Sequence, residues 1–241
     1  MNIDTSPVLS RFTRTPDSGC ASRIVIWQSL LALSILLFLF DLALHSSPAR
    51  AAKPKAAELV EDGQLIDLNS ERYQLLYKEL KETHQFNQAE LDTVFKGVAI
   101  NKRVLELMDR QWEAKPYYKY RPLFITSKTI STGKKKLKEH EALLSRIESK
   151  FGVDREVVIA IWGIESRFGT HSGSFPVFET LNTLFDAYPR RSKFFRKQLV
   201  HFLLLCRENE IDPLVVKGSY AGAFGQTQFI PSSFREYAVS F

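Results

Sequence analysis

One carboxylate in this chain stands at the end of an apolar helical run, where it could act as an acid. The residues around Glu165 include Ile161, Trp162, Ile164 and Phe168. A carboxyl among such side chains loses solvation in its ionised form, which favours the protonated acid near pH 7. Cleavage of a glycosidic bond needs such a donor, because the leaving sugar oxygen must be protonated as the bond breaks.

A serine beside this acid raises the question of nucleophilic catalysis. Ser166 follows Glu165, but His140, His171 and His201 lie in different contexts, and no nucleophile-elbow pattern surrounds the serine. A serine nucleophile needs a base within hydrogen-bond reach. The sequence therefore favours acid–base chemistry by Glu165.

A second dense segment, residues 218–234, carries glycines and amides. Gly218, Gly222 and Gly225 indicate close backbone approach, and Gln226 and Gln228 could orient sugar hydroxyls or acetamido groups. A substrate-lining turn is one interpretation. A tight glycine-rich helix junction, with the glutamines in solvent, is the other.

Composition indicates one globular domain with a basic bias. The chain has 241 residues, 44% hydrophobic and 25% charged, with a formal net charge of +6. The bias suits an anionic polymer such as a cell-wall glycan, an acidic membrane face or nucleic acid, although a solvated helix face is the commoner explanation for such basic runs. We find no zinc-ligand spacing, phosphate loop or RNA-binding signature, so no metal or nucleic-acid partner is expected.

The N-terminal part predicts export. An apolar run at residues 24–40 follows Arg11, Arg14 and Arg23 and precedes a small-residue site at Ala51. Residues 1–51 therefore form a signal peptide or a membrane anchor, with cleavage favoured, and residues 24–40 could hold the protein at a membrane. We expect a linker and lead-in segment at 52–69 and a catalytic domain at 70–241.

The two cysteines predict no intramolecular disulfide after cleavage. Cys20 precedes the apolar run, whereas Cys206 lies in the apolar segment 202–206. A buried structural thiol is the expectation for Cys206.

Helical periodicity dominates the rest, which predicts a mostly α-helical domain without a strand ladder. Helices are expected from Ser70, after Asn87, and from Ser131 or Thr132 to Lys150. Further helices are expected after a cap at Asp154 and over 177–188 and 194–209. The apolar positions expected to face inward are Tyr73, Leu76, Tyr77, Leu80, Leu91, Val94, Phe95, Val98, Leu137, Leu143, Leu144, Ile147, Val157, Val158, Ile161, Trp162, Phe195, Leu199, Phe202 and Leu203.

Residues 112–125 carry two prolines and several aromatic residues, which predicts an extended arm. It is either a packed connector or a segment in which some of Tyr117, Tyr118 and Tyr120 line a sugar cleft, because aromatic faces stack on pyranose rings.

Ordered motifs along residues 60–241 carry a family resemblance. The chain resembles the B-type family of membrane-bound lytic murein transglycosylases. The motifs that match are Phe124–Thr126, Phe151–Val153, Gly163–Gly169, Tyr188–Arg191, Lys217–Ser219, Ala221–Ser233 and Tyr237–Val239.

The resemblance implies a lysozyme-like helical fold that acts on peptidoglycan glycan strands in the bacterial periplasm or cell envelope. Glu165 would be the sole general acid and base, and would form 1,6-anhydromuramoyl ends without net hydrolysis. Most glycosidases need two carboxylates. The nearest downstream acids, Glu179 and Asp186, are not part of the motifs, and Asp186 is more simply a surface or capping group.

The resemblance also assigns substrate contacts. Ser219 would position the substrate near the acid, Gln228 would line the cleft, and Phe229, Arg190, Arg191 and Tyr120 match glycan-contacting positions. For each arginine, a structural ion pair at a helix start is an equal alternative.

Members of the family continue past the position of Phe241 with an Asp-rich calcium-binding loop and further helices, so no cofactor or metal is expected within this sequence. We therefore expect a C-terminally incomplete domain that is weakly stable and weakly active. A non-catalytic peptidoglycan-binding remnant and a lysozyme-type hydrolase are the alternatives.

Overall fold

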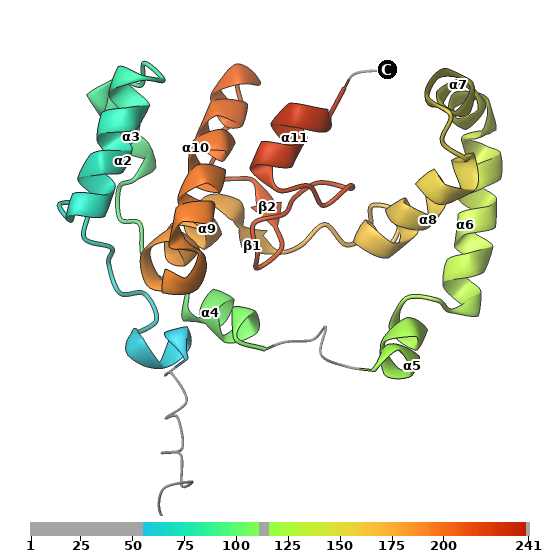
Figure 1. Ribbon diagram of the computed structural model, residues 1–241, viewed down its shortest axis with the longest axis horizontal. Coiled ribbons are helices and arrows are strands. Elements are labelled where there is room, and N and C mark those ends of the chain that lie inside the picture. Colours follow the sequence, from blue (N-terminus) through green and yellow to red (C-terminus); the bar gives the residue numbers. More distant parts are fainter. Residues whose placement is uncertain (1–54, 111–115, 240–241) are drawn as a thin grey trace, which may run out of the picture. The chain divides into compact units, whose positions relative to one another are not determined.

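The computed structural model describes residues 55–110 and 116–239, and these are mostly helical, as predicted (Figure 1). The elements are η1 (Ala56–Leu59), α2 (Glu71–Glu82), α3 (Gln88–Val94), α4 (Lys102–Met108), α5 (Tyr117–Tyr120), η3 (Arg121–Leu123), α6 (Ser127–Glu139), α7 (Glu141–Phe151), α8 (Arg155–Ser166), β1 (Phe175–Pro176), α9 (Val177–Ala187), η4 (Pro189–Arg191), α10 (Ser192–Glu208), β2 (Lys217–Gly218) and α11 (Pro231–Tyr237).

The first two helices begin where the sequence predicts. Ser70 is the N-cap of α2. Asn87 caps α3 by accepting from the Glu90 N–H at 2.9 Å, and the Glu90 carboxylate accepts from the Asn87 N–H at 2.7 Å. This reciprocal capping satisfies two backbone donors that helical bonds leave free.

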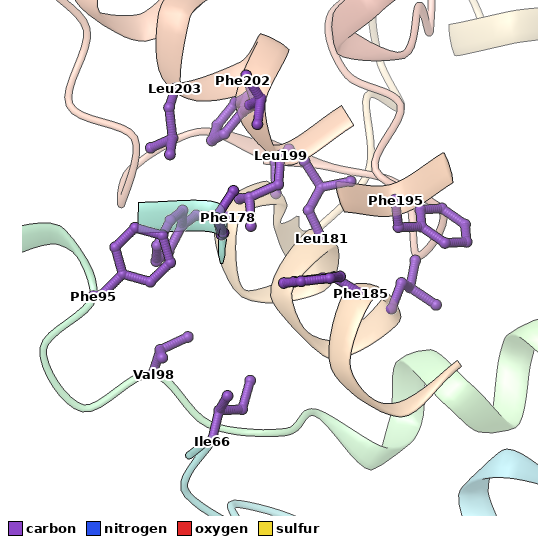
Figure 2. Close-up of a cluster of buried hydrophobic side chains, with 14 of the residues drawn as sticks. Ile66, Phe95, Val98, Phe178, Leu181, Phe185, Phe195, Leu199, Phe202 and Leu203 are labelled. Atoms are coloured by element: carbon purple, nitrogen blue, oxygen red, sulfur yellow. The ribbon is translucent and has the colours of Figure 1, made fainter. Parts of the chain in front are cut away.

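The core forms around α9 and α10, and Figure 2 shows Phe178 and Leu181 of α9 beside Leu199 of α10. Helices α2, α3 and α4 add further buried side chains to the same cluster. Phe95 packs edge-on against Phe178 with ring centroids 5.0 Å apart, and Tyr73 lies 5.0 Å from Phe185. The inward positions predicted on α2 and α10 are confirmed. They are Tyr73, Leu76, Tyr77, Leu80, Phe195, Leu199, Phe202 and Leu203.

One buried polar contact joins α2 to α9 inside this core. The Tyr73 hydroxyl donates to Asn182 Oδ1 at 3.0 Å, and both residues are 0% exposed. Burial raises the pKa of Tyr73, because the phenolate would lose its hydration. Asn182 Nδ2 in turn donates to the Phe178 carbonyl, so the amide is paired at both ends.

The segment predicted to be a linker and lead-in reaches the core. Ala56 and Ala57 are each 7% exposed and belong to the core cluster, and Leu65 forms a bridge with Ala99. This segment is therefore attached to the domain through Ala56, Ala57 and Ile66, which are buried in the core cluster. Its earlier residues, the predicted signal or anchor and residues 24–40 lie outside the described ranges.

No helix within residues 55–110 and 116–239 is both long enough and apolar enough to cross a bilayer.

The predicted extended arm is helical over residues 117–123. Residues 112–115 fall outside the described ranges, but α5 and η3 follow at once. Pro116 is the N-cap of α5, and Pro122 lies in the first turn of η3. Proline is tolerated in a first helical turn, where its missing N–H would have no partner. The two prolines begin helical turns here instead of preventing them.

The predicted long helix ending at Lys150 is two helices. α6 starts four or five residues earlier than predicted, because Thr126 Oγ1 accepts from the Thr129 N–H at 3.0 Å. His140 departs from helical geometry with φ −110° and ψ 19°, and its ring packs 5.7 Å from that of Trp162 on α8. The C-terminal end before Gly152 is confirmed, since Gly152 has φ +68°.

Asp154 is the N-cap of α8, but its side chain makes no capping bond. The side chain that caps α8 is Glu148 of α7. Its Oε1 accepts from the Arg155 N–H at 3.2 Å, and its Oε2 pairs with Arg155 Nε at 3.2 Å. The start of α8 is therefore fixed by a neighbouring helix.

A short antiparallel pairing, which the sequence did not predict, joins β1 to β2. Phe175 is opposite Gly218, and Pro176 is opposite Lys217. Two residues per strand are too few to show period-two alternation.

Cys206 is 2% exposed, and burial raises the pKa of its thiol to about 12, which confirms the predicted structural thiol. Since thiolate is the reactive form, we expect a Cys20→Ser variant to resist a thiol-specific disulfide reagent at pH 8 and to react fully in denaturant. A native thiol that reacts as fast as the unfolded one would contradict this burial.

Candidate active site

Glu165 lies in the last turn of α8, and its side chain is exposed. The apolar enclosure that the sequence predicts is absent, because Ile161 is 52% exposed and Ile164 is 43% exposed. The predicted buried stripe through Val157 and Ile161 is also wrong. The buried positions of α8 are Ile159, Gly163 and Ser166.

The face of α8 that is buried is set by a close contact with Phe168. A Cβ on Gly163 would lie 2.7 Å from Phe168 Cζ, whereas a Cβ on Gly133 of α6 would lie 3.4 Å from the same atom. The Phe168 ring also meets the Trp162 ring edge-on at 5.6 Å. Helices α6 and α8 therefore pack around one aromatic ring, and a side chain at position 163 would have to displace this ring.

These two glycines give a matched test. Gly163→Ala is expected to lower the free energy of unfolding by about 1–3 kcal/mol relative to Gly133→Ala, because only the first overpacks the Phe168 ring. Both replacements gain helix propensity alike. Urea unfolding of the two variants measures the difference, and equal stabilities would show that the ring moves freely.

The chain leaves α8 through a left-handed turn. Arg167, Phe168 and Gly169 have φ angles of 49°, 58° and 82°. The Ser166 Oγ accepts from the Gly169 N–H at 3.0 Å and donates to the Trp162 carbonyl at 3.3 Å. These bonds are to backbone groups, which agrees with the sequence interpretation that Ser166 is not a nucleophile.

Ser219 organises the glycine-rich loop, residues 218–229. Its Oγ accepts from the Ala223 N–H at 3.1 Å and from the Ala221 N–H at 3.3 Å. Its own N–H donates to the Ala223 carbonyl at 2.7 Å. The oxygen is engaged within the loop, so the hydroxyl hydrogen is the part that could reach a ligand.

Gln228 connects this loop to the segment after α8. Its Nε2 donates to the Ser172 carbonyl at 3.1 Å and to the Gly225 carbonyl at 2.8 Å. Its amide is therefore not free in solvent, and Oε1 remains to contact a sugar. Phe229 is half-buried in the same loop, and its carbonyl accepts from the Phe224 N–H at 3.0 Å.

The same two segments meet through glycines. A Cβ on Gly173, which has φ +94°, would lie 2.0 Å from the Gly218 carbonyl carbon and oxygen. A Cβ on Gly169 would lie 2.9 Å from Gln226 Oε1. Ser219, Gln228 and Phe229 are thus joined to the chain that leaves the helix of Glu165. The glycine spacing was visible in the sequence, but its partners were not.

Arg190 and Arg191 lie in η4 and are exposed. Within the described residues neither forms an ion pair, so these residues give no support to the structural alternative proposed from sequence. Arg191 lies 4.0 Å from the centroid of the Phe194 ring, and Arg190 lies 5.9 Å from that of Tyr188. Stacking on these rings leaves guanidinium N–H groups free to meet a ligand.

Tyr120 lies in α5 and packs 4.9 Å from the Phe124 ring. Tyr117 and Tyr118 are 73% and 69% exposed, so neither is part of a packed connector. The contacts of Tyr120 stay within α5 and the turn after it, and those of Arg190 and Arg191 stay near the start of α10. Among residues 55–110 and 116–239, these ring contacts join none of the three to the loop of Ser219.

The two downstream acids have structural partners. Asp186 pairs with Arg72 at 3.5 Å, and burial raises the pKa of its carboxyl. Glu179 Oε1 accepts from Asn101 Nδ2 at 2.6 Å. Asp186 is therefore a half-buried ion-pair partner, and not the helix cap that the sequence offered as one reading.

Comparison with known proteins identifies the family. The profile of the transglycosylase SLT domain matches residues 69–241. The chain belongs to this family.

The relatives are lytic transglycosylases. The chain is 34% identical over 183 residues to membrane-bound lytic murein transglycosylase B of Escherichia coli (strain K12), covering 72% of this chain and 51% of that protein. It therefore spans about half the length of this curated relative.

Solved structures agree. The catenated lytic transglycosylase SltB1 of Pseudomonas aeruginosa matches with a TM-score of 0.68 and 41% identity over 72% of this chain and 57% of that one. Escherichia coli Slt35 in complex with bulgecin A matches with a TM-score of 0.68 and 34% identity over 76% and 59%. The lysozyme-like helical fold expected from the resemblance is confirmed.

Slt35 has also been solved in complex with calcium. In the part of this chain that the structure describes, no group of three or more His, Cys, Asp or Glu side chains is placed to hold a metal ion. The described residues do not fit a calcium site, and no step of the chemistry below is assigned to one.

Proposed function

We propose that this chain is a lytic murein transglycosylase that cleaves the bond between N-acetylmuramic acid and N-acetylglucosamine in peptidoglycan. The family match over residues 69–241, which includes Glu165 at the exposed end of α8, carries the proposal. P. aeruginosa SltB3, 31% identical over 71% of this chain, has been solved in complex with NAG-NAM-pentapeptide. That complex supports a glycan strand with peptide stems as the substrate.

Glu165 acts first as acid and then as base. It protonates the oxygen that leaves C1 of the muramoyl unit, and its carboxylate then removes the proton of the muramoyl 6-hydroxyl, which attacks C1. The bond from C1 to the leaving oxygen breaks, the bond from C1 to O6 forms, and the proton passes to the leaving sugar. The product ends in a 1,6-anhydromuramoyl unit, and no water is consumed.

A single carboxylate is enough for this reaction, because the substrate itself supplies the nucleophile. Most glycosidases use a second carboxylate as nucleophile or base. In this reaction the muramoyl 6-hydroxyl takes the place of water, and the substrate's own groups stabilise the oxocarbenium-like transition state. Asp186 pairs with Arg72, and Glu179 accepts a hydrogen bond from Asn101. These structural contacts support a mechanism with one catalytic carboxylate.

Because Glu165 is exposed in the free protein, we infer that a bound glycan changes the solvation of its carboxyl. Ile161 and Glu165 lie one helical turn apart on the open face of α8. A pyranose ring bound across both would cover the carboxyl and exclude bulk water from it. The low solvation expected from the sequence would then arise only in the complex.

The remaining site residues would hold the strand. The Ser219 hydroxyl and Gln228 Oε1 would contact sugar polar groups, and Phe229 and Tyr120 would offer ring faces. Arg190 and Arg191, which stack on aromatic rings, would meet carboxylates of the peptide stems. No cofactor is needed for this chemistry.

We also propose that the protein is exported through residues 1–51 and works in the bacterial periplasm, either free after cleavage or held at the membrane by residues 24–40. The basic composition and the membrane-bound relative support an envelope location. Cell fractionation checks this, and a full-length cytosolic pool would contradict it.

Mass spectrometry of the soluble products tests the activity. Incubating the full chain with purified sacculi is expected to release 1,6-anhydromuropeptides, which are one water lighter than the products of hydrolysis. Reducing muramic ends would identify a lysozyme-type hydrolase. Binding to sacculi without any soluble product would identify a glycan-binding remnant.

A further inference from the structure

Ser166 ties the end of α8 to the chain that leaves it. The residue is 1% exposed, although Glu165 before it and Arg167 after it are exposed. Its Oγ bridges the Trp162 carbonyl at 3.3 Å and the Gly169 N–H at 3.0 Å. Its own carbonyl accepts from the His171 N–H at 2.9 Å. Three of its polar contacts therefore meet at the helix end that carries Glu165.

The turn that Ser166 holds is one that side chains disfavour. Arg167 and Phe168 both have positive φ angles, at 49° and 58°. Consecutive left-handed residues other than glycine persist only where the surroundings over-determine them. The Phe168 ring, packed against Gly163, is one such constraint, and the Ser166 bridge is the other.

We propose that Ser166 is a positioning residue that fixes the direction in which the Glu165 carboxyl leaves α8. The inference rests on the proposed function, in which that carboxyl must reach a glycosidic oxygen. Without the Oγ bridge the turn relaxes and the last turn of the helix frays. A displacement of about 1 Å in an acid costs on the order of 100-fold in rate.

The bridge also reaches the substrate loop. The chain from Gly169 to Gly173 contacts Gln226, Gln228 and Gly218. Ser166 is therefore bonded to the segment that contacts the loop of Ser219, and the hydroxyl that holds the end of α8 also holds the start of this segment.

The test replaces Ser166 with alanine, which removes one oxygen from a buried site. In the full chain in mild detergent, release of soluble muropeptides is measured at limiting and at saturating sacculi, and NMR order parameters are measured for the amides of residues 165–169. Thr183→Val is the matched control, because the buried Thr183 hydroxyl accepts from the Asn101 N–H at 2.9 Å. Ser166→Cys keeps the size with a weaker acceptor.

Ser166→Ala is expected to lower the saturating rate by about 10- to 100-fold with little change in half-saturation. The order parameters are expected to fall from about 0.85 toward 0.6, Ser166→Cys to be intermediate, and Thr183→Val to change the melting temperature alone. Unchanged order and rate in Ser166→Ala would overturn the proposal, as would rate losses that follow melting temperature equally in both variants. If the wild type releases nothing, the proposed function fails, and the order parameters alone decide the role of Ser166.

Discussion

Replacing Glu165 by glutamine is expected to reduce anhydromuropeptide release by about 100- to 10,000-fold, the range that general acid–base catalysis contributes. Glutamine has nearly the same shape but can neither donate the proton to the leaving oxygen nor accept one from the 6-hydroxyl. Because the side chain is exposed, the variant should melt at the wild-type temperature. Chromatography and mass spectrometry of the soluble fraction measure the release.

A matched acid nearby serves as the control. Glu156 is exposed in the first turn of the same helix, so Glu156→Gln makes the same chemical change away from the proposed acid. It should leave the rate unchanged. Wild-type turnover in Glu165→Gln would exclude this residue as the acid, and an equal loss in both variants would point to the charge of α8 in general.

Gly173→Ala is expected to lower the free energy of unfolding by about 2–5 kcal/mol, the largest stability effect among the substitutions considered. The new Cβ would lie 2.0 Å from the Gly218 carbonyl group, and the backbone cannot swing aside as a side chain does. A φ of +94° adds strain for any L side chain. Denaturant unfolding followed by circular dichroism gives the value.

Gly152→Ala separates these two causes. Gly152 has φ +68° with nothing within 4 Å of an added Cβ, so it carries the backbone strain without the clash. Its expected cost is about 1–2 kcal/mol. If Gly173→Ala lowers the free energy of unfolding no more than Gly152→Ala does, the segments of Gly173 and Gly218 are not in fixed contact. A locked pair also predicts that Gly173→Ala loses activity at temperatures where it stays folded.

Local patterns predicted most of the helices. α9 and α10 lie within two residues of their predicted limits, and the Asn87 cap begins α3 where expected. Periodicity and capping residues act within one or two helical turns, so a single segment contains all the information they need.

Sequence patterns gave wrong predictions where contacts with another helix determine the burial, the end or the cap of a helix. Val157 and Ile161 are apolar and regularly spaced, yet they are 47% and 52% exposed, because α6 packs on the opposite side of α8. His140 interrupts a periodic run where its ring meets Trp162. The Arg155 N–H at the start of α8 donates to Glu148 of α7, and not to Asp154 as predicted.

The sequence by itself determined the helical class, the core faces of α2 and α10, and Glu165 as the candidate acid, since each depends on residue type and short-range spacing. Only the tertiary structure decided which face of α8 is buried, that Glu165 is exposed, and that the Gly173 and Gly218 segments interlock. Burial and close approach depend on what lies across the contact, and chain order does not state which residues those are.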